Sequence, residues 1–166
     1  MNIPVLETGI SLTITRIFDA PMARVFACFI GKEEMSAWIG PYDIRGEVLE
    51  MEPSIGGRYR IAMRKPDGSE MFAGGAFQAI EAPSRIAFTW QWEDGEANTL
   101  ITIALRDLGG RTEMTFHQEG FKEEIYRDRH IHGWTGCLDK MEAWLTKGVR
   151  QSERGLAKGP VDLSPA

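Results

Sequence analysis

The feature that most constrains the fold is a change of hydrophobic period near residue 120. Residues 111–118 alternate in polarity, as a β-strand does, with one face formed by Thr112, Met114, Phe116 and Gln118. Beyond Gly120 the period becomes helical, and a single stripe carries Trp134, Cys137, Leu138, Met141 and Leu145. A strand followed by a long amphipathic helix indicates a sheet that packs on that helix.

The preceding residues supply the other elements of such a fold. Strands are predicted over 11–18, 44–51, 57–64, 70–80, 86–92 and 98–105, and short helices over 21–30 and 32–39, with Asp19 as the N-cap of the first. We therefore expect an α+β helix-grip fold: a curved antiparallel sheet of about seven strands around a long C-terminal helix, with two short helices after strand 1. A strongly curved sheet cannot close perfectly on one helix, which predicts a cavity between them.

Composition is typical of one globular domain. The chain has 166 residues, of which 43% are hydrophobic. We expect an N-terminal segment over 1–10, the folded domain over 11–147, and a flexible tail over 148–166, where the periodicity stops. The two cysteines, Cys28 and Cys137, lie in apolar helical patterns and are expected to be inert core thiols, with a disulfide or a nucleophilic pair as the alternatives.

Charge and hydropathy exclude several classes of partner. The formal net charge is -5, with 19 Lys and Arg scattered among 24 acids, so no basic patch suits a nucleic acid. No stretch approaches the ~20 apolar residues that a membrane span requires. The N-terminus MNIPVLETG lacks the basic and apolar regions of an export signal, so we expect a cytoplasmic protein.

Several short motifs are spread along the chain. They are Phe18-Asp19-Ala20-Pro21, Val25-Phe26, Trp38-Ile39-Gly40-Pro41, Gly56-Gly57-Arg58-Tyr59-Arg60, Pro66-Asp67-Gly68, Phe88-Thr89-Trp90, His130, Gly133-Trp134 and Leu138-Asp139-Lys140-Met141. Together they resemble the START-like (birch-pollen-allergen-like, polyketide cyclase-like) superfamily. Within it the chain is similar to single-domain proteins related to the C-terminal domain of the heat-shock-chaperone ATPase activator. The resemblance implies a helix-grip fold whose cavity takes an apolar small molecule in many relatives.

Aromatic and apolar side chains are the candidates for the cavity wall. Phe88, Trp90 and Trp92 share one face of a strand, and an indole N–H can orient a ligand oxygen. Ordinary core packing is the alternative for each of them. The full set of candidate cavity residues is Tyr59, Met63, Phe72, Trp90, Met114, Phe116, His130, Trp134, Cys137 and Met141.

Polar residues suggest where a cavity mouth could lie. On a helical wheel, Glu123, Arg127 and His130 share the face of Trp134, whereas His132 points outward. They either line a wet mouth or lie beyond the sheet edge in water. Arg16 also shares an apolar face, and it could pair with a carboxylate, reach solvent, or anchor a ligand carboxylate.

Motifs for a metal, a cofactor or a nucleophile are missing from the sequence. His117, Glu119 and His130 could be imagined as metal ligands, but His117 falls on the outer face of its strand. The pairs Gly56-Gly57 and Gly74-Gly75 are too short for phosphate loops and open no helix. We therefore expect no cofactor and no metal.

Three functions remain open from the sequence. The first is binding of a small apolar or amphipathic molecule, such as a lipid, an aromatic or a polyketide-like compound. The second is a cyclase, dehydratase or hydrolase, in which His130 acts as acid or base and Arg127 or Arg16 holds an oxyanion. The third is a chaperone-activator-like interaction module. An edge strand could also support a homodimer.

Overall fold

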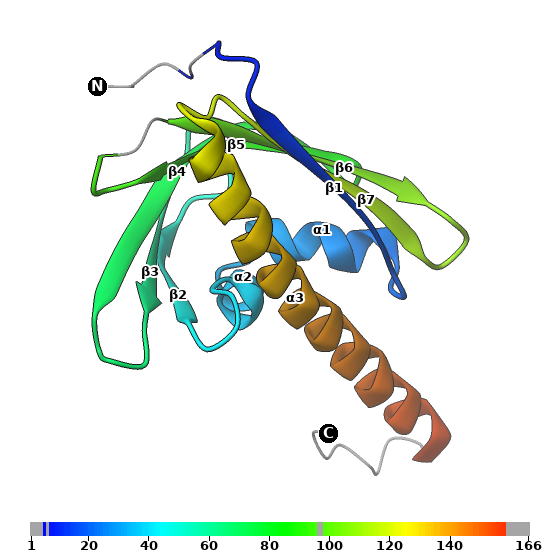
Figure 1. Cartoon of the computed structure of the whole chain (residues 1–166). Helices are drawn as coiled ribbons and strands as arrows, with labels where there is room; N and C mark the ends of the chain where they lie inside the picture. Colours follow the sequence, from blue (N-terminus) through cyan, green and yellow to red (C-terminus); the bar gives the residue numbers. More distant parts are fainter. Residues whose placement is uncertain (1–4, 6, 96–97, 159–166) are drawn as a thin grey trace.

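The computed structural model describes residues 5, 7–95 and 98–158 and confirms the predicted fold class. Seven strands and three helices follow one another along the chain (Figure 1). They are β1 (Ser11–Phe18), α1 (Met22–Ile30), α2 (Lys32–Trp38), β2 (Arg45–Met51), β3 (Arg58–Arg64), β4 (Glu70–Glu81), β5 (Arg85–Trp92), β6 (Thr99–Asp107), β7 (Thr112–Glu119) and α3 (Glu124–Lys158).

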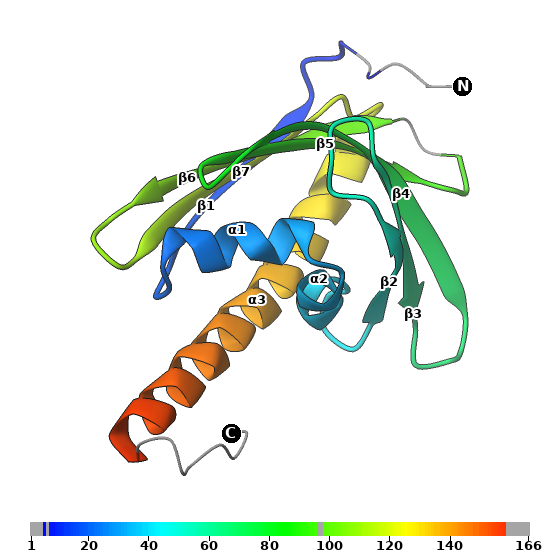
Figure 2. The ribbon, with the colours of Figure 1, turned by 180° about the vertical axis from the view of Figure 1, so that it is seen from behind.

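All seven strands form one antiparallel sheet with the order β1-β7-β6-β5-β4-β3-β2. Strands β2 to β7 are therefore consecutive neighbours, and β1 closes the other edge by pairing with β7. Figures 1 and 2 show the sheet curving over α3, with α1 and α2 on the same concave side. Because each strand alternates, its apolar face can be buried only against these helices.

The core fills most of the space inside the curved sheet. The alternation of β7 is confirmed, since Thr112, Met114, Phe116 and Gln118 are all fully buried. The Trp134 ring of α3 lies 4.9 Å from the rings of both Trp90 and Phe116, measured between centroids. Aromatic side chains therefore occupy the centre of the fold, and the remaining space lies toward one end of it.

Some element boundaries differ from the sequence prediction. Helix α1 begins at Met22 with Pro21 as its N-cap and has no side-chain cap, so Asp19 does not cap it. Pro21 has the extended backbone of an N-cap residue, so Asp19 lies two residues before the cap position. Helix α3 continues to Lys158, so part of the predicted tail over 148–166 is helical, and 159–166 lies outside the described residues.

The loop from Gly40 to Ile44 is fixed against α3. Lys140 Nζ donates to the carbonyl oxygens of Gly40 (2.6 Å) and Ile44 (2.9 Å). Gly136 allows close approach, because a Cβ there would lie 2.9 Å from both Pro41 Cβ and Tyr42 Cε2. These contacts place the loop beside the N-terminal half of α3, where it forms one lip of the pocket described below.

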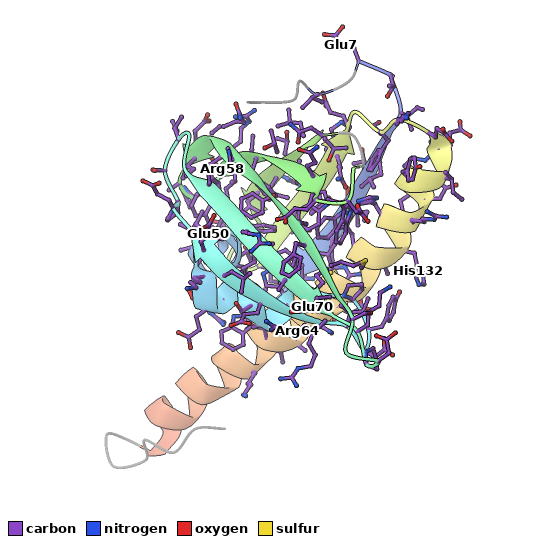
Figure 3. The ribbon with its side chains drawn as sticks, turned by 90° about the vertical axis from the view of Figure 1, so that its left-hand side faces the viewer. Glu7, Glu50, Arg58, Arg64, Glu70 and His132 are labelled. Atoms are coloured by element: carbon purple, nitrogen blue, oxygen red, sulfur yellow. The ribbon has the colours of Figure 1, made fainter. Side chains whose placement is uncertain are left out.

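The outer face of β2–β4 is charged (Figure 3). Arg64 pairs with Glu47 (2.6 Å) and Glu70 (2.9 Å) across neighbouring strands, and Arg60 pairs with Glu93 (2.8 Å). The pairs are solvent-exposed, where water and salt screen the charges, so they contribute little to stability. The ion pairs identify the face of the sheet that is exposed to water. The opposite, apolar face packs on the helices.

Candidate ligand pocket

A pocket of about 460 Å³ lies between β3–β5 and the N-terminal half of α3, beside the loop from Gly40 to Ile44. Its floor is formed by buried side chains, namely Met63, Trp90, Trp134 and Cys137. Its rim carries the exposed residues Lys65, Asp94, Arg129 and His132. An apolar floor with a polar rim suits a molecule that has an apolar body and a polar end.

The structure places five of the ten candidate cavity residues on this pocket: Met63, Trp90, His130, Trp134 and Cys137. Four others, Tyr59, Met114, Phe116 and Met141, are buried in the packed core and do not line it. The Tyr59 hydroxyl donates to the carbonyl oxygen of Thr89 (2.6 Å), and burial raises the pKa of Tyr59 well above its ordinary value. Tyr59 is therefore a structural side chain here.

Phe72 lies on the opposite face of the sheet from the one expected. Its ring lies under the guanidinium of Arg60, 4.3 Å from the Cζ atom, on the charged outer face. The register of the β3–β4 hairpin explains this placement, because Met63 pairs with Met71 and Ala62 with Phe72. Met71 lines the pocket in place of Phe72. The length of the turn after Arg64 fixes which residue of β4 pairs with Met63, so it was the sequence signal that could have identified Met71.

His130 lies between two elements and has both ring nitrogens engaged. Nδ1 is 2.7 Å from the carbonyl oxygen of Tyr126, and Nε2 is 3.0 Å from the indole Nε1 of Trp92. A carbonyl only accepts and an indole N–H only donates, so the proton is on Nδ1 and Nε2 accepts. Burial lowers the pKa of His130, more strongly than the bond to Tyr126 raises it. The ring is thus held neutral as a tether between α3 and β5.

The burial of His130 predicts a pH-dependent stability. Its folded-state pKa lies below the ordinary value of 6.5, so the unfolded chain binds the proton more readily. The contribution of neutral His130 to the free energy of unfolding is fully present above pH 6.5. It falls as the pH decreases from 6.5 toward the folded-state pKa. Urea unfolding at pH 7.5 and pH 5.5 should show that His130→Gln loses less stability on acidification than the wild type does. An equal loss in both proteins would contradict the assignment.

The expected charged mouth residues are placed differently. Glu123 is exposed, and Arg127 Nε bonds to Asp128 (3.1 Å) on the same helix without lining the pocket. Glu123 precedes α3 and Arg127 lies in its first turn, and neither charged side chain lines the pocket. Arg16 pairs with Asp139 of α3 (2.8 Å), which is the carboxylate alternative. His132 is exposed, as expected, but lies on the rim and stacks on Tyr42.

Neither cysteine has the environment of a nucleophile. Cys28 and Cys137 are free and buried, and burial raises the pKa of both thiols to about 12. Each is therefore protonated near neutral pH, and the thiol of Cys137 presents a small, weakly polar surface to the pocket floor. Among the described residues, no group of three or more His, Cys, Asp or Glu side chains is arranged to hold a metal ion.

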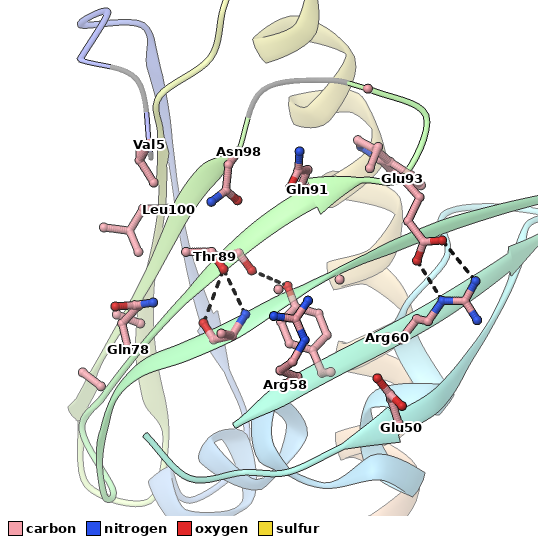
Figure 4. A pocket seen from close by; sticks show the side chains of 18 of the residues that line it. Val5, Glu50, Arg58, Arg60, Gln78, Thr89, Gln91, Glu93, Asn98 and Leu100 are labelled. Carbon is pink, nitrogen blue, oxygen red and sulfur yellow. Dashed lines mark hydrogen bonds and ion pairs between the residues drawn. The ribbon is translucent and has the colours of Figure 1, made fainter. Parts of the chain in front are cut away.

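A larger groove of about 890 Å³ lies on the outer face of the sheet (Figure 4). It is lined mainly by polar side chains, including Arg58, Gln78, Thr89 and Gln91. Thr89 Oγ1 accepts from the backbone N–H of Ala76 (2.9 Å), and the Arg60–Glu93 pair forms one wall. A wide, polar, water-facing groove offers little apolar area to a ligand, so the concave-side pocket is the stronger candidate despite its smaller volume.

The fold and the pocket together define a START-like helix-grip protein. The sequence from residue 19 to residue 146 matches the family model described as Activator of Hsp90 ATPase homolog 1-like protein. The chain belongs to this family. Among the described residues, no helix is both long and apolar enough to cross a membrane.

Solved structures agree on the fold. A protein from Chromobacterium violaceum is 24% identical with a TM-score of 0.77, over 82% of this chain and 96% of that one. The AHSA1 protein from Silicibacter pomeroyi is 20% identical with a TM-score of 0.73, over 82% and 97% of the two chains. CalU16 from Micromonospora echinospora is 19% identical with a TM-score of 0.61, over 89% and 84%. A comparison with curated protein sequences finds no match.

Proposed function

We propose that this protein binds a small amphipathic molecule in the pocket between β3–β5 and α3. The observation that carries the proposal is the pairing of a buried apolar floor (Met63, Trp90, Trp134) with an exposed polar rim. The apolar body of the ligand would lie on the two indoles, and its polar end would lie among Lys65, Arg129 and His132 at the rim. A volume of about 460 Å³ is in the range of small-molecule sites.

The state of His130 favours binding over catalysis. A general base needs a free lone pair within reach of the substrate. In His130, the Nε2 lone pair accepts a hydrogen bond from the indole of Trp92, and Nδ1–H donates one to the backbone carbonyl oxygen of Tyr126. Arg127, the proposed oxyanion partner, does not line the pocket. Arg16, the alternative oxyanion partner, is paired with Asp139 and does not line the pocket either, so these contacts favour binding over the enzyme hypothesis.

The exposed surface gives less support to a protein partner. Among the side chains that the structure describes, the large apolar ones that are exposed are spread over β1, two loops and α3: Ile17, Tyr42, Ile55, Ile125 and Ile131. A docking surface would gather such residues into one patch. The cytoplasmic location and the homodimer stay predictions.

The test is a fluorescence titration with N-phenyl-1-naphthylamine, an aromatic probe that brightens in apolar sites. We expect saturable binding at one site, with a Kd between about 1 and 200 µM for a ligand of this size. Met71→Glu places a carboxylate in the half-buried pocket wall and should weaken binding by at least about tenfold. The reason is that the probe must then desolvate that charge or leave it unpaired.

Phe72→Glu is the matched control, because it makes the same charge change on the next residue of β4. Phe72 is also half-buried but lies on the outer face, against Arg60. Its affinity for the probe should stay within about twofold of the wild type. Equal weakening in both variants, or no saturable binding to the wild type, would contradict the proposal.

A further inference from the structure

The indole N–H of Trp90 differs from those of three other tryptophans in the fold. Trp38 donates to the carbonyl of Cys28 (2.9 Å), Trp92 to His130 (3.0 Å) and Trp134 to Gln118 Oε1 (2.7 Å). Trp90 is 2% exposed, and its Nε1 atom finds no hydrogen-bond acceptor among the described residues. A buried donor without an acceptor costs about 1–3 kcal/mol, so this position calls for an explanation.

The polar side chains around Trp90 are engaged with other partners. Thr99 Oγ1 donates to the backbone carbonyl of Trp90 (2.8 Å) and accepts from Gln118 Nε2 (2.9 Å). Gln118 Oε1 accepts a hydrogen bond from the indole of Trp134, and His130 Nε2 accepts one from the indole of Trp92. These bonds hold the acceptors on their present partners, because moving any one of them would leave another buried donor unsatisfied.

Two spaces adjoin Trp90. One is the ligand pocket, and the other is a gap of about 10 Å³ that also touches Trp92, Thr99 and His130 and is about the size of one water molecule. Both spaces touch the Trp90 side chain, whereas Nε1 itself has less than 1 Å² of exposed surface. A ligand oxygen in the pocket or a single water in the gap therefore accepts from Nε1 after the side chains around the indole shift slightly. The two sources give different results in the experiment below.

Resting on the proposed function, we infer that Trp90 Nε1 donates a hydrogen bond to an uncharged oxygen of the ligand. The ligand class is thus an apolar or aromatic compound with a carbonyl group within its apolar body. A carboxylate is disfavoured at that depth, because the cations that line the pocket, Lys65 and Arg129, are exposed at the rim. A pure hydrocarbon would occupy the same floor without satisfying the indole.

The experiment compares two probes of almost the same shape, 2-acetylnaphthalene and 2-isopropenylnaphthalene, which differ by O in place of CH2. Each is added to ¹⁵N-labelled wild-type protein, and the indole N–H signals of the five tryptophans are followed by NMR. The Trp90 signal is identified as the one missing from Trp90→Phe, or by nuclear Overhauser contacts in the wild type. We expect a downfield proton shift of the Trp90 signal with the ketone and not with the alkene.

Displacement of N-phenyl-1-naphthylamine by the same two probes gives a second readout. The Kd ratio of alkene to ketone should fall by about fivefold from the wild type to Trp90→Phe, because only the ketone loses a hydrogen bond. If both probes displace but the ratio and the indole signal do not respond to the oxygen, water satisfies Trp90; the inference is then overturned and the proposed function stands. If N-phenyl-1-naphthylamine binds saturably but the ketone does not displace it, the inference is overturned and the proposed function stands. If N-phenyl-1-naphthylamine itself does not bind, the proposed function fails and the inference fails with it. The wild-type NMR arm decides the question even if Trp90→Phe does not fold.

Discussion

Trp134→Ala should lower the free energy of unfolding by about 3–5 kcal/mol, the range for removing a large buried aromatic. Trp134 is 4% exposed and contacts aromatic rings on three sides, with centroids 4.9 Å away at Trp90, 4.9 Å at Phe116 and 6.5 Å at Trp38. It joins α3 to β5, β7 and α2 at once. The substitution would also leave Gln118 Oε1 without its buried donor. Urea unfolding monitored by far-UV circular dichroism measures the loss.

Ile131→Ala on the same helix is the control. Ile131 is 39% exposed, so its truncation should change the free energy of unfolding by no more than about 0.5 kcal/mol. A loss below about 1 kcal/mol for Trp134→Ala would mean that the grip between sheet and helix does not depend on this side chain. The packing described for the centre of the fold would then be wrong.

Gly75→Ala should cost about 2–4 kcal/mol, an unusually large effect for a single added methyl group. A Cβ at this position would overlap the backbone carbonyl oxygen of Thr89 on the neighbouring strand. The strands cannot separate cheaply there, because Thr89 Oγ1 also accepts from the N–H of Ala76 (2.9 Å). Chemical denaturation against the wild type gives the difference.

Gly133→Ala provides the contrasting glycine. Its Cβ would meet only Pro41 Cγ at 3.9 Å, an ordinary contact, and alanine is the better helix former. This substitution should therefore stabilise the protein by about 0.5–1 kcal/mol. If the two alanine variants changed stability equally, the close approach of β4 and β5 at Gly75 would be refuted.

The sequence predicted the elements well wherever their period was unambiguous. The strand over 11–18 was placed at its observed bounds because Leu12, Ile14 and Phe18 share one face, even though Arg16 interrupts it. The end of the last helix was less accessible: polar residues after Gly148 give no periodic signal, yet α3 continues to Lys158. In β4, the register of pairing with β5 shifts between Phe77 and Ala79, and the sequence pattern did not locate this shift.

The site was predicted less completely than the fold. The alternation of residues along a strand shows which face of the sheet a side chain is on, but not whether it lines the pocket or lies in the filled core. Met114 and Phe116 face inward as expected, but they lie in filled core away from the pocket. Residues of the loop from Gly40 to Ile44 were not candidates, since a loop has no periodicity from which a direction can be inferred. The tether of His130 to Trp92 joins residues 38 positions apart and depends on tertiary structure alone.

The most direct test of the pocket is a two-dimensional ¹H–¹⁵N NMR titration of the whole chain with N-phenyl-1-naphthylamine. We expect saturating shifts, at one equivalent, for the indole signals of Trp90, Trp92 and Trp134 and for the backbone amide of Gly133. Shifts confined to the outer face around Arg58, Thr89 and Gln91, or shifts that never saturate, would show that the space between the sheet and α3 is not the binding site.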